Sequence, residues 1–336
     1  MDWVAIFENT MRGLIGESAI YFALAAIGLN IHFGYTGLLN FGQAVFMAAG
    51  AYGLAMIVVT LGPLYSFIPG SFWFGVFVGV VVFPLILAAL MGVPTLRLRA
   101  DYLAIVTIAF AEMFRIVARS PTFDKWTGSS DGLGEFADTF YELSPFDPQQ
   151  RYLGLWLGNQ MWVVLVGWVV LSLAVLLVWL LIRSPWGRVI KAIREDEDAA
   201  RSLGKNAYWY KMQSLALGGM LGAVGGMLRA IGQQSTQPQQ FITDVTFFVW
   251  VALILGGPGK VMGPVIGAAI LWGVLNFTDI LLRQLVENDY IPDSIMTGTQ
   301  VGQVRFMLIG LGLVLLAAFR PQGIFGSKEE MALDDR

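Results

Sequence analysis

Long apolar stretches, separated by short polar segments, recur along almost the whole chain. About nine of them approach the roughly 20 residues that an α-helix needs to cross a bilayer. The pattern predicts an all-α polytopic membrane protein with about 8–10 transmembrane helices. The predicted spans cover roughly residues 14–33, 40–60, 72–93, 102–118, 161–182, 207–231, 245–255, 261–282 and 304–319.

Glycine-rich segments stand at two places along this pattern and predict breaks in the helices. The segment "GYTGLLNFGQ" at 34–43 precedes the second span. The segment "GGPGKVMGP" at 256–264 interrupts the region 245–282, which forms either broken helices or two complete spans. Both segments place glycines just before an apolar helix, as the repeated halves of many transporters do. The two segments resemble each other in composition, and chance explains this resemblance equally well.

Residues 184–211 form the most densely charged segment of the chain. A long charged insert between two spans has to face water, and its Arg and Lys residues indicate the cytoplasmic side. Ser184 is placed to cap a short helix that has Pro185 at its first position. Gly204 is placed to end a second short helix, and Asn206 to cap the span that follows.

The charges of the other loops predict how the chain alternates across the membrane. Arg97, Lys260 and Arg320 mark cytoplasmic segments, whereas the loops at 119–159 and 284–300 are acidic or uncharged. This pattern places the C-terminus in the cytoplasm and, with nine spans, the N-terminus outside, although one re-entrant segment would reverse the N-terminus. We predict a single transmembrane domain over residues 1–336, with an outer loop at 119–159, a cytoplasmic loop at 184–206 and a cytoplasmic tail at 321–336.

Composition argues against a catalytic role. The chain is 56% hydrophobic and 13% charged, with no cysteine and a single histidine, His32, which excludes thiolate and histidine-cluster metal sites. A P-loop needs G-x-x-x-x-G-K-[ST], but the Gly259-Lys260 pair has Ile254 and Val261 at the other motif positions. We therefore predict no cofactor or metal in this chain, no enzymatic activity and no nucleic-acid partner; membrane lipid surrounds it.

Polar side chains inside membrane spans are costly, and they are therefore candidates for function. Thr36, Asn40 and Gln43 in the first glycine-rich break supply neutral hydrogen-bonding groups for a substrate path, and the helix start that follows favours a carboxylate. Close helix packing through small residues is the competing interpretation, and both stay open. Glu112 and Arg115 lie on one face of the fourth span, where an ion pair with each other is favoured over substrate contact.

Six segments in order resemble the LivM-type permease family of branched-chain amino-acid ABC importers, and the resemblance covers nearly the whole chain. In one of them, Asp198, Ala199 and Ala200 are followed four residues later by Gly204. This spacing resembles the Glu-Ala-Ala-x-x-x-Gly coupling loop of ABC importer permeases, with Asp in place of Glu. The segments are "GYTGLLNFGQAVFMAAGAY" at 34–52, "PTLRLRADYLAIVTIAFAEMFR" at 94–115, "WTGSSDGL" at 126–133, "GRVIKAIREDEDAARSLGKNAYWYK" at 187–211, "ILGGPGKVMGPVIGAA" at 254–269 and "FRPQGIFG" at 319–326.

The resemblance implies a pore built with a related LivH-type permease, two ATP-binding subunits that hold ATP and magnesium, and an extracytoplasmic solute-binding protein. It implies a multi-pass location in a bacterial plasma (inner) membrane and alternating access driven through the coupling loop at 184–206. We expect an apolar face formed by Val189, Ile193, Ala200 and Leu203 to contact the ATPase. The residues implied in coupling are Arg188, Arg194, Glu195, Asp198, Ala199, Ala200 and Gly204.

One departure from the family pattern leaves the substrate open. Asn40 and Gln43 stand where relatives often have Ser and His, so the cargo is a branched-chain amino acid or else another amino acid, an amide or urea. A competing class is an ion-driven secondary transporter, for which Glu112 is the one good candidate coupling group. A third class, an intramembrane enzyme, lacks a recognisable nucleophile–base pair or metal set.

Overall fold

The computed structural model describes residues 1–61, 71–98, 100–288, 290–291, 297–298, 300–320 and 322–325. Helices dominate these residues, which confirms the predicted all-α class. The main helices, in chain order, are α1 (Trp3–Ile15), α2 (Glu17–Leu29), α3 (Gln43–Met56), α4 (Ser71–Phe77), α5 (Phe83–Thr95), α6 (Ala100–Arg119), α9 (Gly158–Arg183), α10 (Pro185–Glu195), α12 (Ala207–Gln233), α13 (Thr243–Gly256), α14 (Gly263–Glu287) and α15 (Val301–Phe319).

Short elements extend or connect these helices. Leu133 of β1 pairs antiparallel with Thr236 of β4, and Arg151 of β2 pairs with Leu157 of β3. The short elements are the π-helical η1 (Asn30–Tyr35), η2 (Ile57–Leu61) and η3 (Val78–Val82), the 3-10 helices η4 (Pro121–Phe123) and η5 (Pro238–Phe241), the helices α7 (Asp124–Thr127), α8 (Asp138–Glu142) and α11 (Glu197–Ser202), and the strands β1 (Leu133–Gly134), β2 (Arg151–Tyr152), β3 (Trp156–Leu157) and β4 (Ser235–Thr236).

Each predicted span coincides with a helical run. Within the described residues, six runs are long and apolar enough to cross a membrane, and α13 and the first part of α15 are shorter apolar helices. The 20-residue α6 corresponds to the predicted fourth span at 102–118. The region 245–282 forms two helices, α13 and α14, joined by a turn at 257–262 in which Gly257 and Gly259 have positive φ. The predicted tail lies outside the described residues from residue 326 onward.

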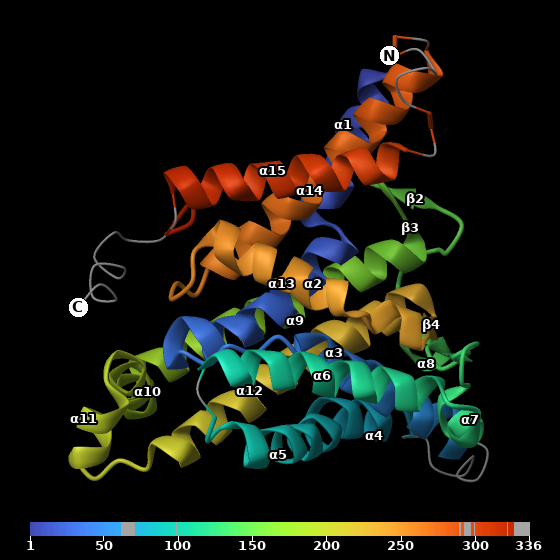
Figure 1. The fold of residues 1–336 in the computed structure, drawn as a ribbon. Coiled ribbons are helices and arrows are strands. Elements are labelled where there is room, and N and C mark those ends of the chain that lie inside the picture. Colours follow the sequence, from blue (N-terminus) through green and yellow to red (C-terminus); the bar gives the residue numbers. More distant parts are fainter. Residues whose placement is uncertain are drawn as a thin grey trace.

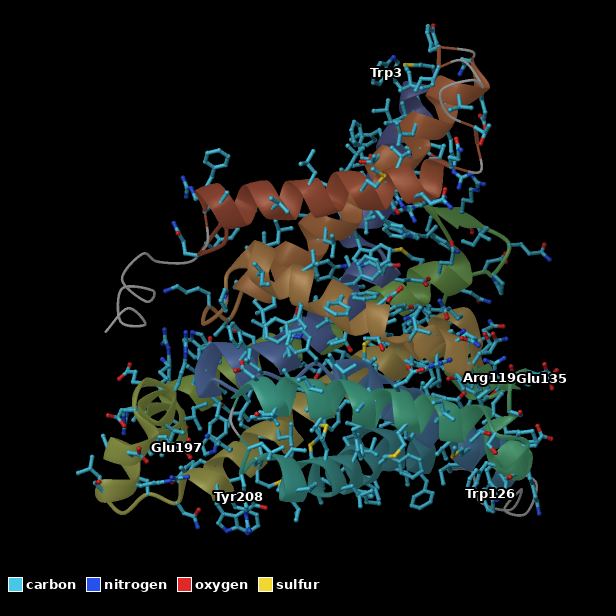
Figure 2. All side chains as sticks on the ribbon, in the orientation of Figure 1. Trp3, Arg119, Trp126, Glu135, Glu197 and Tyr208 are labelled. Carbon is cyan, nitrogen blue, oxygen red and sulfur yellow. The ribbon has the colours of Figure 1, made fainter. Side chains whose placement is uncertain are left out.

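The charged insert and the outer loop lie at opposite ends of the helix bundle (Figure 1). Helices α10 and α11 project at one end, where α15 also finishes, whereas α7, α8 and the short strands lie at the other end, where the N-terminus is also found. In Figure 2, Glu197 and Tyr208 mark the insert end, and Arg119, Trp126 and Glu135 mark the outer-loop end. This arrangement agrees with the alternation that the loop charges predict.

Helix α2 is the centre of the bundle. Its residues from Ala19 to Leu29 are all buried, and it packs against α9, α12, α13 and α14. A helix that is apolar on every side belongs in the interior, with other helices around it. Its approach to α12 is very close, because a Cβ placed on Gly28 would lie 2.2 Å from the carbonyl oxygen of Gly218. Only glycine permits two helix backbones to meet at that distance.

Pro84 lies inside a membrane span, directly after a π-helical turn. The run Ser71–Thr95 is continuous, and η3 comes directly before α5, whose second residue is Pro84. Proline lacks an amide donor and its ring crowds the preceding turn, and a widened π-turn accommodates both effects. The span therefore stays helical through the proline.

Candidate functional site

The first glycine-rich break is a stretch of non-helical backbone between η1 and α3. Gly37 has a φ of +74°, which turns the chain out of η1. The amides that open α3 have no partner within the helix, and side chains from three elements bind them. Asn40 Oδ1 accepts from Gly42 N at 2.8 Å, Thr107 Oγ1 on α6 accepts from Phe41 N at 3.0 Å, and Thr246 Oγ1 on α13 accepts from Ala44 N at 2.9 Å.

A set of buried polar side chains fills the space beside this break. We call it the polar cluster. His32 Nε2 lies 3.1 Å from the carbonyl oxygen of Leu215, and its Nδ1 lies 3.1 Å from the Asn40 amide nitrogen. Because that amide donates, Nδ1 accepts and the ring proton sits on Nε2, where it binds the carbonyl. The members of the polar cluster are Asn30, His32, Thr36, Asn40, Gln43 and Ser214, all 0–2% exposed.

The other side chains of the polar cluster form hydrogen bonds with residues of α2, η1 and α12. Thr36 and Ser214 hydroxyls lie 2.6 Å apart, and Thr36 also donates to the Ile31 carbonyl at 2.8 Å. Gln43 Nε2 donates to the carbonyls of Ala25 at 3.1 Å and Gly218 at 3.3 Å. Buried polar groups are stable at membrane depth when they are paired in this way.

The structure thus places the candidate path residues in a sealed position. Thr36, Asn40 and Gln43 are buried in this conformation; Asn40 contacts Gln43, and Thr36 contacts Ser214 of α12. Of the four predicted path residues, Glu112 alone reaches the surface, and its side chain is 37% exposed. Helix packing, the competing interpretation of the break, accounts for the observed contacts.

Asn30 joins the two glycine-rich segments. Its amide nitrogen donates to the Lys260 carbonyl at 2.9 Å, and its amide oxygen accepts from Gly259 N at 2.9 Å. A Cβ on Gly34 would lie 2.6 Å from Gly259 N, so the two segments touch directly. The two segments, which resemble each other in composition, are therefore also in physical contact.

Arg194 of α10 reaches from the charged insert to the first break. Its guanidinium donates a hydrogen bond to the Gly34 carbonyl. Its side chain also covers Gly37, where an added Cβ would lie 3.3 Å from Arg194 Cγ. A hydrogen bond from a charged donor is roughly twice as strong as a neutral one. The insert and the break are consequently connected without an intervening residue.

The local structure of the insert agrees with its sequence. Ser184 Oγ accepts from Gly187 N at 3.4 Å, which caps α10 behind Pro185. Gly204 has a φ of +77° and ends α11 in the left-handed conformation that glycine favours. Asn206 Oδ1 accepts from Trp209 N at 3.2 Å and caps α12. The predicted two short helices and their caps are confirmed.

The orientation of the insert differs from the expected one. Ile193 and Ala200 are 3% and 4% exposed and pack against Ala207 inside the protein. Arg194 is exposed, but its guanidinium reaches the Gly34 carbonyl. The expected apolar docking face is therefore wrong for Ile193 and Ala200, because these side chains hold the insert to α12. Leu203, by contrast, is 80% exposed.

The other residues implied in coupling lie on the outer side of the insert. The exposed positions are Arg188, Glu195, Asp198, Ala199 and Gly204. The Asp198 side chain is 93% exposed and lies 3.5 Å from Arg201. A partner that approaches the insert end meets this mixed acidic and basic surface with Leu203 beside it.

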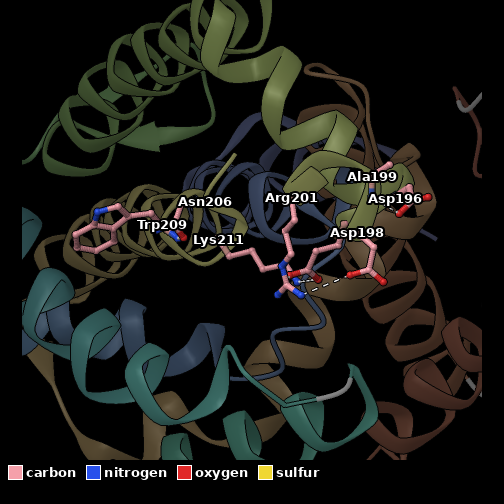
Figure 3. Close-up of polar contacts among 8 residues, drawn as sticks. Asp196, Asp198, Ala199, Arg201, Asn206, Trp209 and Lys211 are labelled. Carbon is pink, nitrogen blue, oxygen red and sulfur yellow. Dashed lines mark hydrogen bonds and ion pairs between the residues drawn. The ribbon is translucent and has the colours of Figure 1, made fainter. Parts of the chain in front are cut away.

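Glu197 connects the insert to the span that follows, α12. Its carboxylate accepts from Arg201 at 2.7 Å within α11 and forms an ion pair with Lys211 of α12. Figure 3 shows the side chains of Arg201 and Lys211 converging from these two helices. The Lys211 side chain is 15% exposed, so water screens this pair less than the surface pairs. Asp196 caps α11 by accepting from Ala199 N at 2.9 Å. These contacts join α11 to α12 and fix the start of α11.

The predicted pair on α6 is present. Arg115 Nε donates to both carboxylate oxygens of Glu112 at 3.0 Å, and the guanidinium also donates to Gln239 Oε1 at 3.2 Å. A bidentate pair of this kind satisfies the carboxylate. Its contacts link α6 to η5, which favours the structural interpretation of Glu112.

Several residues of this site carry no signal in the sequence that points to their role. Asn30, Ser214, Thr246 and Trp250 have no motif of their own. Ser214 bonds the Thr36 hydroxyl, Thr246 accepts from Ala44 N at the start of α3, and Trp250 Nε1 donates to the Asn40 carbonyl at 3.1 Å. Asn30 bonds Gly259 and Lys260 of the second glycine-rich segment. The available signal was the cost of a polar side chain inside an apolar span. That cost predicts that such a side chain forms a hydrogen bond, but it does not predict which residue is the partner.

Comparison with known proteins places these features in a family. The family model described as "Branched-chain amino acid transport system / permease component" matches residues 14–318. The "High-affinity branched-chain amino acid transport system permease protein LivM" of Escherichia coli (strain K12) is 29% identical over 326 residues, which cover 92% of this chain and 69% of that protein.

Two further relatives differ in coverage. The "Probable branched-chain amino acid transport permease protein LivM" of Methanocaldococcus jannaschii is 26% identical and covers 94% of both chains. The "Autoinducer 2 import system permease protein LsrC" of Salmonella typhi is 28% identical over 151 residues, or 43% of each chain. Similarity thus extends over more than nine-tenths of the chain for the LivM relatives and over less than half for the LsrC relative.

Proposed function

The chain belongs to the branched-chain amino acid transport permease family, and on that premise we propose that it imports branched-chain amino acids as a pore subunit driven by ATPases. In this proposal it pairs with a related permease, two ATP-binding subunits and an extracytoplasmic solute-binding protein. The ATPases hold ATP and magnesium, and this chain has no cofactor of its own. The coupling loop and the C-terminus face the cytoplasm of a bacterial cell.

The observation that carries the proposal is the hydrogen bond from Arg194 to the Gly34 carbonyl. When the ATPases close on ATP, they displace the exposed side of α10 and α11. Arg194 passes this displacement to η1, and Asn30 passes it to the turn between α13 and α14. A two-state element that several contacts bias together is what alternating access requires.

In the proposal, the polar cluster beside the break also contacts the substrate. Thr36, Asn40 and Gln43 are sealed here, and in our proposal they meet substrate only when the break opens toward the path. The exposed N-terminus of α3 then favours the substrate carboxylate. Closing the break restores the hydrogen bonds within the cluster and releases the substrate.

Reconstitution tests this function directly. The purified complex in proteoliposomes is expected to accumulate labelled leucine only with ATP and with every partner present, and isoleucine and valine compete. Uptake by this chain alone, driven by an ion gradient, would contradict the proposal. In that case the variant Glu112→Gln tests whether Glu112 is the coupling group. An ion-driven transporter that uses Glu112 would lose uptake in this variant, whereas an ATP-driven importer would retain it.

A different cargo is the second candidate. The relative named as an autoinducer 2 permease indicates that related chains carry other solutes, and Asn40 and Gln43 bring amide groups to the break. Competition of leucine uptake by glutamine, acetamide and urea separates these cargoes. Competition by an amide or urea, without competition by isoleucine, assigns the chain to the second cargo class.

A further inference from the structure

A pocket of about 250 Å³ opens where α9, α10 and the turn between α13 and α14 meet. Three cationic side chains line it, Arg183 from α9, Lys191 from α10 and Lys260 from the turn. Tyr35 and Trp179 form aromatic walls. Helix α10 and the turn lie at the same end of the molecule (Figure 1).

The chemistry of this pocket suits a small anion. Among the described residues that line it, three are cationic and none is acidic, so the lining carries a net positive charge. Pockets for drug-sized ligands measure roughly 300–1,000 Å³, and this smaller volume fits a phosphate-sized group. The Arg183 guanidinium carbon lies 3.8 Å from the centre of the Trp179 ring, and Lys191 Nζ lies 5.7 Å from that of Tyr35. These cation–π contacts orient two of the cations at the wall.

The pocket lies at the level of lipid headgroups. Helix α9 has 26 residues and is therefore about 39 Å long, whereas the hydrocarbon core of a bilayer is about 30 Å thick. Arg183 is its last residue, and the exposed Trp179 lies one turn earlier, where aromatic side chains mark the membrane interface.

An apolar stripe on α9 leads into the pocket. Leu173, Leu176 and Leu180 are 60%, 51% and 55% exposed. At spacings of three and four residues they share one helix face, and Arg183 continues that face by three residues. A lipid whose acyl chain lies along the leucines thus brings its headgroup to the cations.

We propose that this pocket binds the headgroup phosphate of an anionic phospholipid. Basic pockets between transmembrane helices are a known mode of lipid recognition. The lipid phosphate bridges α9, the coupling helix α10 and the turn at 257–262, and Lys191 lies one turn before Arg194. Bound lipid therefore holds α10 against the break. Lipid binding requires only that the chain spans a membrane, so its failure leaves the proposed transport function untouched.

Native mass spectrometry of the full chain, delipidated in mild detergent, tests this site. Phosphatidylglycerol is expected to bind more tightly than phosphatidylcholine with the same acyl chains. Arg183→Gln, Lys191→Gln and Lys260→Gln each weaken phosphatidylglycerol binding by about fivefold, the effect expected for one cation near a membrane surface. Binding of phosphatidylcholine stays unchanged in these variants.

Matched controls make the result decisive. Lys205→Gln removes an exposed cation from the same insert but outside the pocket, and it retains wild-type lipid binding; Arg183→Lys retains the preference for phosphatidylglycerol. Equal binding of the two lipids, or wild-type binding by all three Gln variants, overturns the proposal. Competition by millimolar inorganic phosphate assigns the pocket to a free anion and overturns it as well. Variants that keep lipid binding but lose a co-purifying ATPase would instead mark a protein contact.

Discussion

The guanidinium of Arg194 donates a hydrogen bond to the backbone carbonyl of Gly34. This contact joins the water-facing insert to the glycine-rich break, which lies among the helices of the bundle. Gly34 is buried in the π-helical segment η1, whereas Arg194 is an exposed residue of the insert whose guanidinium reaches that carbonyl. The proposed coupling between ATPase and pore depends on this contact.

Removing the contact should uncouple transport from ATP hydrolysis. We expect Arg194→Gln to lower uptake in proteoliposomes by at least about tenfold, because a charged hydrogen bond is worth about 1.5–3 kcal/mol. ATP hydrolysis and assembly of the complex should persist. Lys205→Gln, an exposed change in the same insert, serves as the control. Wild-type uptake by Arg194→Gln would rule out the proposed route.

The exposed leucine of the insert should be needed for ATPase binding. Leu203→Glu places a charge where 80% of the residue is exposed, so the fold is expected to survive while the apolar contact is lost. Leu153 in the outer loop is 76% exposed and provides a matched control, Leu153→Glu. Pull-down of the ATPase subunits measures the effect, and equal recovery with both variants would exclude Leu203 from the interface.

The ion pair between Glu197 and Lys211 should stabilise the position of the insert. Lys211→Met leaves the Glu197 carboxylate with Arg201 alone, and we expect a loss of about 1–2 kcal/mol, less than for a fully buried pair. Thermal unfolding of the purified protein and protease cleavage within the insert report the loss. The double variant Glu197→Gln with Lys211→Met should recover part of it, and additive losses would argue against a direct pair.

The crossing of α2 and α12 should not tolerate a methyl group. A Cβ on Gly218 would lie 2.3 Å from His32 Nε2 and 2.4 Å from the Gly28 carbonyl oxygen. We expect Gly218→Ala to destabilise the protein by about 1–3 kcal/mol, the cost of overpacking. Gly310→Ala on α15 meets no atom within 4 Å and should be neutral. Equal melting temperatures of the two variants would contradict this packing.

Much of the local architecture followed from short stretches of sequence. Ser184 with Pro185, Gly204 and Asn206 each act on amides or backbone angles within three residues. Such caps depend on neighbouring residues alone, and the structure confirms them. The spans were predictable for the same reason, since lipid demands continuous apolar helices whatever their neighbours are.

The faces of these elements were less predictable. Val189, Ile193, Ala200 and Leu203 share an apolar character that suits a partner or the core equally well. The structure turns Ile193 and Ala200 inward and leaves Leu203 exposed. An apolar pattern predicts that these side chains are buried. Whether α12 or a partner protein buries them depends on how the insert folds back onto α12.

The amino-acid sequence by itself determined that the chain is a membrane-spanning helical protein with a capped, charged insert, because hydropathy and capping act over a few residues. Only the tertiary structure decided that Asn30 bridges two breaks more than 200 residues apart and that Arg194 reaches Gly34. These hydrogen bonds satisfy groups that lie far apart in the chain. Their partners are chosen by the way the helices pack, which no local pattern encodes.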